Sequence, residues 1–233
     1  MKKIILKVST VLVLGTSVSS PFPVIDAAQV AESILTAARW IKQGYEWKRE
    51  IEQWEADIKA VTEFRLDGNI LDKFTELNDL LGSYGLDMGD LDLDNPKSQI
   101  GVYAKALFDS YLIFNDCSYD YFSDNQKKIC KNKMVRNVQE MATSHKLSKN
   151  MSGLLEKLNE LNTKLKDSED IKSSQDITAG IQSVVSSMKA IRIQYEMMSM
   201  RNQAKKEIEQ RQLEQIEKRK RNNAASFIDQ DFL

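Results

Sequence analysis

The chain has 233 residues, of which 42% are hydrophobic and 29% are charged, and its formal net charge at pH 7 is −1. This length suits one sizeable domain with or without a small appendage, and the near-neutral charge argues against a protein that binds nucleic acid in bulk. Only nine glycines and three prolines are present, so the sequence predicts a mostly helical protein.

Residues 1–19 have the pattern of a secretory signal peptide, with a basic start, a short apolar run and small residues before an expected cleavage after Ser19. The apolar run is shorter than the ~20 residues that span a bilayer, so a membrane anchor is the weaker alternative. Loss of Lys2, Lys3 and Lys7 with this segment changes the net charge by three, from −1 to −4. We therefore expect a mature protein that acts outside the cytoplasm and has no stable membrane span.

The first long segment, residues 20–65, predicts a helix that lies lengthwise against other helices. All three tryptophans share its apolar stripe with a glycine and two isoleucines, in steps of three and four residues: Trp40, Gly44, Trp47, Ile51, Trp54 and Ile58. The glycine would let a neighbouring helix approach closely. We expect the tryptophans in the core of a bundle. The alternative is that one or more of them faces a partner subunit, since tryptophan is enriched at binding hot spots.

Residues 66–148 break this pattern and predict a small helical appendage inserted into the bundle. The segment combines short helices, a stretch rich in glycine and aspartate, and most of the tyrosines and phenylalanines. It also holds the only two cysteines, Cys117 and Cys130. An isolated pair this close is expected to form a disulfide in an oxidising compartment, worth ~3 kcal/mol for a loop of this length.

Residues 149–222 return to helical stripes and predict the second and third helices of the bundle. Their expected core includes Leu158, Met188 and Tyr195. Residues 223–233 are expected to be a flexible end. The sequence as a whole predicts an all-α protein, an elongated three-helix bundle with a small helical globular appendage.

No residue pattern points to catalysis, to a metal or to a cofactor. The stretch Asp90–Asn95 begins like a calcium-binding EF-hand loop, but the expected glycine is Asn95 and the expected acid is Gly101. His145 is the only histidine and has no nucleophile motif near it in the sequence. We therefore expect a protein that is not an enzyme and that binds no cofactor, metal or nucleic acid.

Both ends of the chain carry a likeness to one family. A proline, a valine and an aspartate lead into a helix rich in glutamine, tyrosine and tryptophan. The residues that carry the likeness are Pro23, Val24, Asp26, Tyr45, Ile51, Glu52, Gln53 and Trp54. This start resembles the mature N-terminus of the minor pilus subunits of type IV secretion and conjugation systems. Residues 173–212 are similar to the last helix of that family, and the cysteine pair between the two ends is similar to what many members show.

The resemblance implies a bundle with an appendage, export to the periplasm and incorporation at the tip of a pilus on the cell surface. It also implies contact with the major pilin and other secretion-system subunits, in an assembly that could include further copies of this chain. Adhesion to a receptor on a recipient or host cell would use the appendage, with six candidate residues: Tyr84, Asp90, Asp92, Tyr119, Tyr121 and Phe122.

Two other functions fit the same helical stripes. A soluble periplasmic assembly factor for an envelope machine would use a helix-binding groove built from the same residues as a bundle core, without entering the surface filament. A pore-forming or effector protein is the third possibility.

Overall fold

The computed structural model describes residues 27–62, 66–168 and 170–230, so the expected signal peptide and residues 20–26 lie outside the described part. Within these ranges the chain is all-α, as the sequence predicts, and contains no strand. The elements are α1 (Ala27–Thr62), α2 (Gly68–Ser83), η1 (Met88–Asp90), α3 (Gln99–Ser110), η2 (Asn115–Cys117), α4 (Asp124–Lys166) and α5 (Ile171–Gln230).

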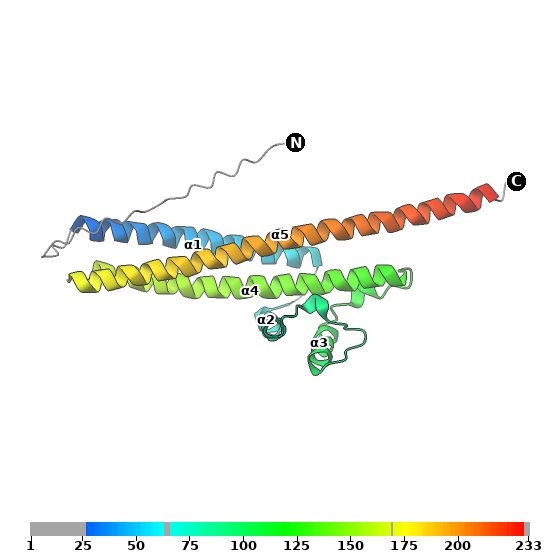
Figure 1. The fold of residues 1–233 in the computed structure, drawn as a ribbon, viewed down its shortest axis with the longest axis horizontal. Coiled ribbons are helices and arrows are strands. Elements are labelled where there is room, and N and C mark those ends of the chain that lie inside the picture. The colour runs from blue at the N-terminus through cyan, green and yellow to red at the C-terminus, as the bar shows by residue number, and fades with distance from the viewer. Residues whose placement is uncertain (1–26, 63–65, 169, 231–233) are drawn as a thin grey trace.

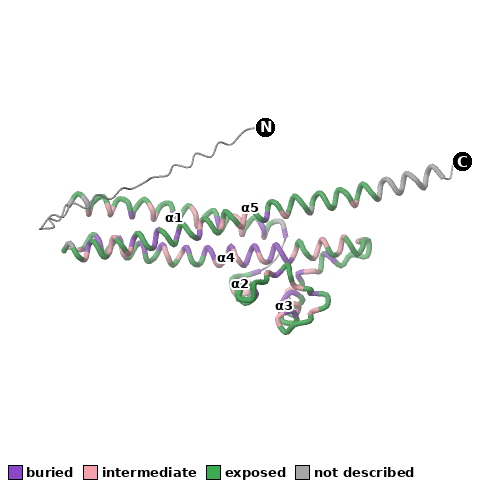
Figure 2. The backbone as a smooth tube through the Cα atoms, viewed as in Figure 1, coloured by how far each residue is buried: buried purple, intermediate pink, exposed green. Residues whose placement is uncertain are grey.

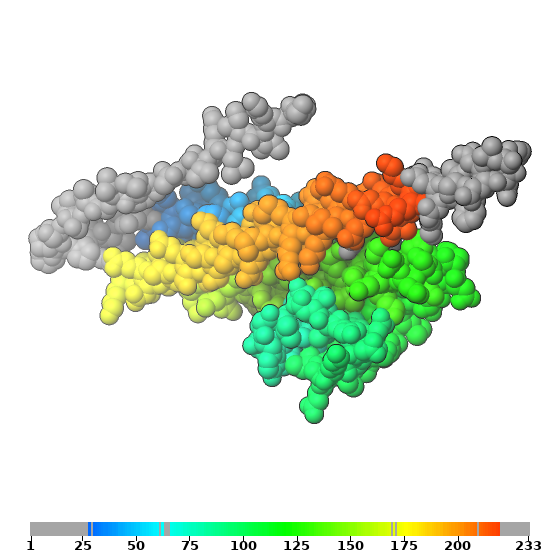
Figure 3. Space-filling model, turned by 45° about the vertical axis from the view of Figure 1, so that its right-hand side comes forward, coloured from blue at the N-terminus to red at the C-terminus, as the bar shows by residue number. Residues whose placement is uncertain are grey.

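Three long helices, α1, α4 and α5, lie side by side and form a rod (Figure 1). Each of them contacts the other two. The turn between α4 and α5 is short, which makes these two helices antiparallel neighbours. The part between α1 and α4, residues 66–123, forms an appendage that protrudes from one side of the rod (Figures 1 and 3). The appendage contacts the rod mainly through α4, which packs against α2, η1 and η2.

The molecule has two apolar cores, and α4 contributes to both of them. The appendage core packs Phe74 of α2 and Phe108 of α3 against residues 135–142 of α4. The rod core packs α1 and α5 against residues 147–165 of α4. Buried positions therefore continue along most of α4 (Figure 2). One uninterrupted helix carries the appendage at one end and the rod at the other.

This continuity corrects the expected start of the second bundle helix at residue 149. The helix begins at Asp124, where Ser123 caps it and the Gln126 side chain accepts a hydrogen bond from the Ser123 backbone N–H at 3.0 Å. A serine followed three residues later by a glutamine is a helix-start signal that the sequence contains. The boundary between residues 148 and 149 thus lies within α4. At the other end, α5 continues to Gln230 and includes most of the segment expected to be flexible.

The part of α5 around Asn202 and Lys206 packs against α4 beside buried polar groups. Arg136 and Glu140 of α4 are both buried and pair at 3.6 Å, and Lys206 of α5 lies 3.8 Å from the same carboxylate. Asn202 of α5 is buried beside them, at the groove that Glu140 lines. Removing one partner of a buried ion pair is costly, so these groups favour one alignment of α5 on α4.

Gly44 marks the closest approach of the three long helices. A Cβ atom built there would lie 2.1 Å from Cε of Met188 on α5 and 2.7 Å from Cδ2 of Leu155 on α4. Farther along the same contact, the buried hydroxyl of Ser144 donates a hydrogen bond to the backbone carbonyl of Ile51 at 3.0 Å. Small side chains at these positions let α1 and α4 pack closely, as the sequence predicts for Gly44.

We expect Gly44→Ala to lower the free energy of unfolding by about 1 kcal/mol. Overpacking of a core costs roughly 1–3 kcal/mol, and the better helix propensity of alanine returns about 1 kcal/mol of it. Gly153→Ala is the matched control, because Gly153 is an exposed position within α4 with nothing within 4 Å of its Cβ. The control should be stabilised by ~1 kcal/mol in chemical denaturation. Equal stabilisation of both variants would disprove the close approach at Gly44.

Candidate functional site

The tryptophan stripe lies between α1 and α5. Trp40 and Trp47 are half-buried, with ring centroids 6.2 Å apart, and the Lys189 ammonium of α5 lies 4.4 Å from the Trp40 ring. Trp54 meets Tyr195 of α5 edge to face at 5.5 Å. These contacts use part of each indole inside the molecule. The alternative, that one or more tryptophans faces a partner subunit, stays a prediction for the exposed part of each ring.

The other residues expected in the core or at an interface pack beside this stripe. Ile51, Leu158 and Met188 are fully buried in the rod core, and Ile58 is buried in the appendage core. Tyr195 is half-buried, and this burial raises the pKa of its hydroxyl. These side chains are therefore used for packing inside the molecule.

The predicted disulfide between Cys117 and Cys130 is confirmed. It joins η2 to the second turn of α4, with the two Cα atoms 5.5 Å apart. Cys117 is fully buried. The bond therefore ties the loop between α3 and α4 to the start of α4.

Three aromatic side chains of this loop form a cluster, here called the aromatic cluster: the exposed Tyr119 and Tyr121 and the half-buried Phe122. The two tyrosine rings stack at 5.3 Å, and Phe122 meets them edge to face at 5.8 and 4.9 Å. Tyr121 is 73% exposed and Tyr119 is 47% exposed. The structure thus brings together three of the six residues expected on an adhesive surface.

Asp90 and Asp92 line a groove of about 670 Å³ that borders the same loop. Its opposite wall is α4, with Lys127, Lys128 and Lys131, and Asp124 lies two residues after Phe122. The Asp92 carboxylate accepts a hydrogen bond from the backbone N–H of Asn95 at 3.1 Å, as expected for a surface turn. Tyr84, the sixth candidate, is 65% exposed at the end of α2 and does not line this groove.

Leu112 is a surface residue that sequence reasoning missed. It is 72% exposed and has a φ of 52°, in the left-handed region that favours glycine. The backbone N–H of Ile113 donates to the carbonyl of Phe108 at 3.2 Å, so Leu112 occupies the glycine position of a Schellman motif that ends α3. In the equivalent motif that ends α2 this position is Gly85, with a φ of 71°. Leu112 is unfavourable for two reasons: its backbone is in the left-handed region, and its apolar side chain is exposed to water. Such a residue is a candidate for contact with a partner.

Polar contacts fix the appendage on the rod. Arg201 of α5 donates to Asp87, the residue that caps η1, at 2.9 Å. Lys146 of α4 pairs with Asp79 of α2 at 2.6 Å. Next to it, hydrogen bonds from Lys149 lower the pKa of the Asp72 carboxyl below its ordinary value of 3.8, so Asp72 stays charged above that pH.

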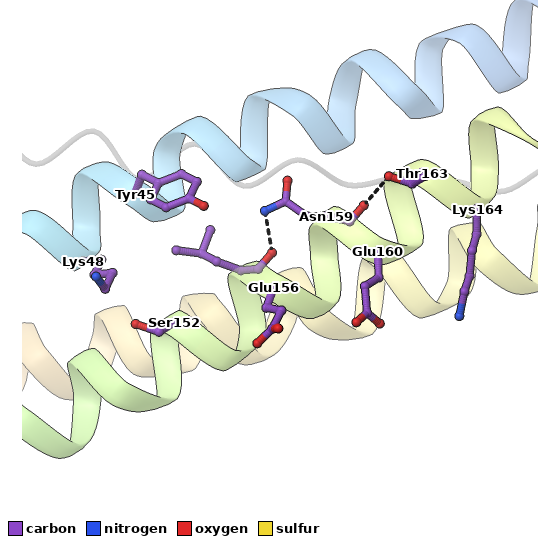
Figure 4. A pocket seen from close by; sticks show the side chains of 9 residues that line it. Tyr45, Lys48, Ser152, Glu156, Asn159, Glu160, Thr163 and Lys164 are labelled. Carbon is purple, nitrogen blue, oxygen red and sulfur yellow. Dashed lines mark hydrogen bonds between the residues drawn. The ribbon is translucent and has the colours of Figure 1, made fainter.

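A groove of about 730 Å³ lies between α1 and α4 on the rod (Figure 4). Tyr45 enters it from α1, and Asn159 and Thr163 line it from α4. Both α4 side chains donate to backbone carbonyls of their own helix, at 3.0 and 3.1 Å. The polar groups of these two side chains are therefore used within α4.

The described residues contain no group of three or more histidine, cysteine, aspartate or glutamate side chains placed to hold a metal ion. No helix that the structure describes is both long and apolar enough to cross a membrane. The appendage surface includes the aromatic cluster, the groove that Asp90 and Asp92 line, and exposed side chains such as Leu112 and Tyr84.

Comparison with known families gives one finding. A family model described as type IV secretion system proteins matches residues 22–214, which include the appendage and most of the rod. Neither the curated proteins nor the solved structures contain a match to the chain.

Reduction of the disulfide is expected to lower the free energy of unfolding by about 3 kcal/mol, because the bond closes a loop between residues 13 apart in sequence. Chemical denaturation of the oxidised protein and of Cys117→Ser/Cys130→Ser measures the difference. Thiol labelling of the native protein should detect no free cysteine. Full labelling of both thiols would contradict the disulfide.

We expect Leu112→Gly to raise the free energy of unfolding by about 0.5–1 kcal/mol, because glycine removes the left-handed strain and the exposed side chain loses little packing. The matched change is Gly85→Ala, which should destabilise the protein by about 1 kcal/mol, since it introduces strain where φ is 71°. Thermal unfolding measures both. A loss of stability in Leu112→Gly would show that this leucine serves the fold.

Proposed function

The chain belongs to the family of type IV secretion system proteins, and from this membership we propose that it is a minor pilus component located at the pilus tip. In this role it is exported to the periplasm, is needed for assembly of the pilus and contacts a recipient or host cell. The observation that carries the proposal is the division of the molecule into a rod for assembly and an appendage that protrudes with exposed aromatic side chains (Figures 1 and 3).

The rod has an apolar surface suited to assembly. Six residues on the outward face of α5 are apolar and exposed, in steps of three and four: Ala190, Ile193, Met197, Met200, Ala204 and Ile208. Such a stripe on a helix is typical of a protein–protein contact. We assign this stripe to contact with a neighbouring secretion-system subunit, the major pilin included.

The appendage has a different character, because exposed aromatic and acidic side chains gather on its loop between α3 and α4. Binding residues are often found on loops that a rigid scaffold holds in position. Here the scaffold is α4, to which the disulfide ties the loop of the aromatic cluster. This arrangement supports a role of the appendage in contact with the partner cell.

Filaments sheared from cells that produce the epitope-tagged chain test the proposal. We expect signal at filament ends for the natural sequence and for Tyr121→Ala, and loss of attachment to recipient cells for Tyr121→Ala. Met200→Lys should remain in the periplasm, because it places a charge in the α5 stripe. Gln203→Lys is the matched control, since Gln203 is exposed on the same helix outside the stripe.

The distribution of the signal decides between the two functions. Signal in the periplasm alone would overturn the pilus-tip role and favour a soluble assembly factor. Loss of filaments in Tyr121→Ala would overturn the separation of assembly from cell contact. Point changes suit this test better than replacement of residues 84–96 by a linker, because that segment contains Met88 and Leu93 of the appendage core.

A further inference from the structure

The segment around the aromatic cluster combines exposed rings with one sign of charge. Residues 107–126 contain six aromatic residues and four aspartates but no lysine or arginine. Two of the exposed rings, Tyr119 and Tyr121, stack on each other, and their loop is tied to α4 by the disulfide. Rigid tyrosine rings provide contact area at a small cost in conformational entropy.

Most of these aspartates have no cation beside them. Asp109 pairs with Lys105 of the same helix at 2.9 Å. Within the described ranges no lysine or arginine forms an ion pair with the other three, Asp116, Asp120 and Asp124, and all three are exposed. A cationic partner would meet both carboxylates and ring faces on this loop, whereas the next lysines in the sequence, Lys127 and Lys128, lie on α4 in the wall of the groove.

The molecule itself contains a cation that contacts both a carboxylate and an aromatic ring, in the groove that Asp90 and Asp92 line. Lys131 of α4 pairs with Asp94, and its ammonium lies 5.9 Å from the centroid of the Phe114 ring. One cation thus contacts a carboxylate and an aromatic face together. Cations over aromatic faces are stabilised by the ring quadrupole, and a neighbouring carboxylate adds attraction.

We propose that the aromatic cluster, with Asp116 and Asp120, is a docking surface for an arginine side chain presented by a partner protein. The planar guanidinium can stack on a tyrosine face while its N–H groups donate to a carboxylate, which an ammonium does less well. The inference rests on the proposed function for where the partner protein is encountered, namely at the pilus tip. The binding chemistry depends only on this surface.

Peptide titration of the purified, oxidised full-length protein tests the proposal. The probe is a five-residue glycine–serine peptide with a central arginine, and the readout is the ring signals of tyrosine and phenylalanine in NMR spectra. Peptides with lysine or with uncharged citrulline at the centre are the controls for charge and shape. We expect signals of the aromatic cluster to shift with arginine, less with lysine and not with citrulline, and the affinity to fall with added salt.

Variants locate the binding site. Tyr121→Ala should weaken binding of the arginine peptide about two- to five-fold. Asp116→Asn/Asp120→Asn should weaken it about three- to ten-fold, because two exposed charge pairs are lost. Tyr121→Phe should retain binding. Tyr103→Ala, at an exposed tyrosine on α3 outside the cluster, and Asp176→Asn on α5 should have no effect.

Several results would overturn the proposal, and one further pair separates it from the pilus-tip role. Equal shifts with arginine and citrulline would remove the role of charge, and binding unchanged by Tyr121→Ala would place the site elsewhere. Shifts with maltohexaose but with none of the peptides would assign the surface to a glycan. A protein that is absent from filaments but binds the arginine peptide would contradict the pilus-tip role and leave this inference intact. A protein found at filament ends that fails to bind the arginine peptide would support the pilus-tip role and overturn this inference.

Discussion

The structure depends on the continuity of α4 across two cores. Residues 135–142 of this helix close the appendage core, and residues 147–165 close the rod core. Most contacts between the two parts run through this helix, and Ile58 of α1 and the bond from Arg201 to Asp87 add to them. The buried ion pair of Arg136 and Glu140 lies in the first of these segments, so the same turns also hold the outer part of α5. The position of the appendage is therefore set by the helix that builds the rod.

Polar contacts on α4 add precision to this arrangement. Ser144 donates to the backbone of α1, whereas Lys146 and Lys149 pair with carboxylates of α2. Surface ion pairs of this kind contribute little each, up to ~1 kcal/mol. Their main effect is on orientation, because they fix which face of α4 each neighbouring helix covers. The aromatic cluster thus has a defined orientation relative to the rod.

The sequence predicts the rod better than the appendage, for a physical reason. The stripe of Ile51, Met188 and their neighbours repeats every three or four residues, and Gly44 shows where helices meet. The first half of α4 was assigned to the appendage because its buried positions include Arg136, Glu140 and Ser144, which interrupt an apolar stripe. Contacts between Tyr119, Tyr121 and Phe122, and the left-handed Leu112, depend on loop backbone that no periodicity describes. The capping signal at Ser123 was available and marks the true start of the helix.

The location of the disulfide has a consequence for the order in which the molecule matures. The bond closes wholly between the appendage loop and the first turns of α4, and the structure describes no other cross-link. Helices form and pack within microseconds to milliseconds, whereas oxidation of thiols takes seconds to hours. The rod can therefore be complete while the loop is still reduced, and the aromatic face takes its final form last. A chain held in a reducing compartment would therefore have a packed rod and an appendage loop that lacks its covalent tie to α4.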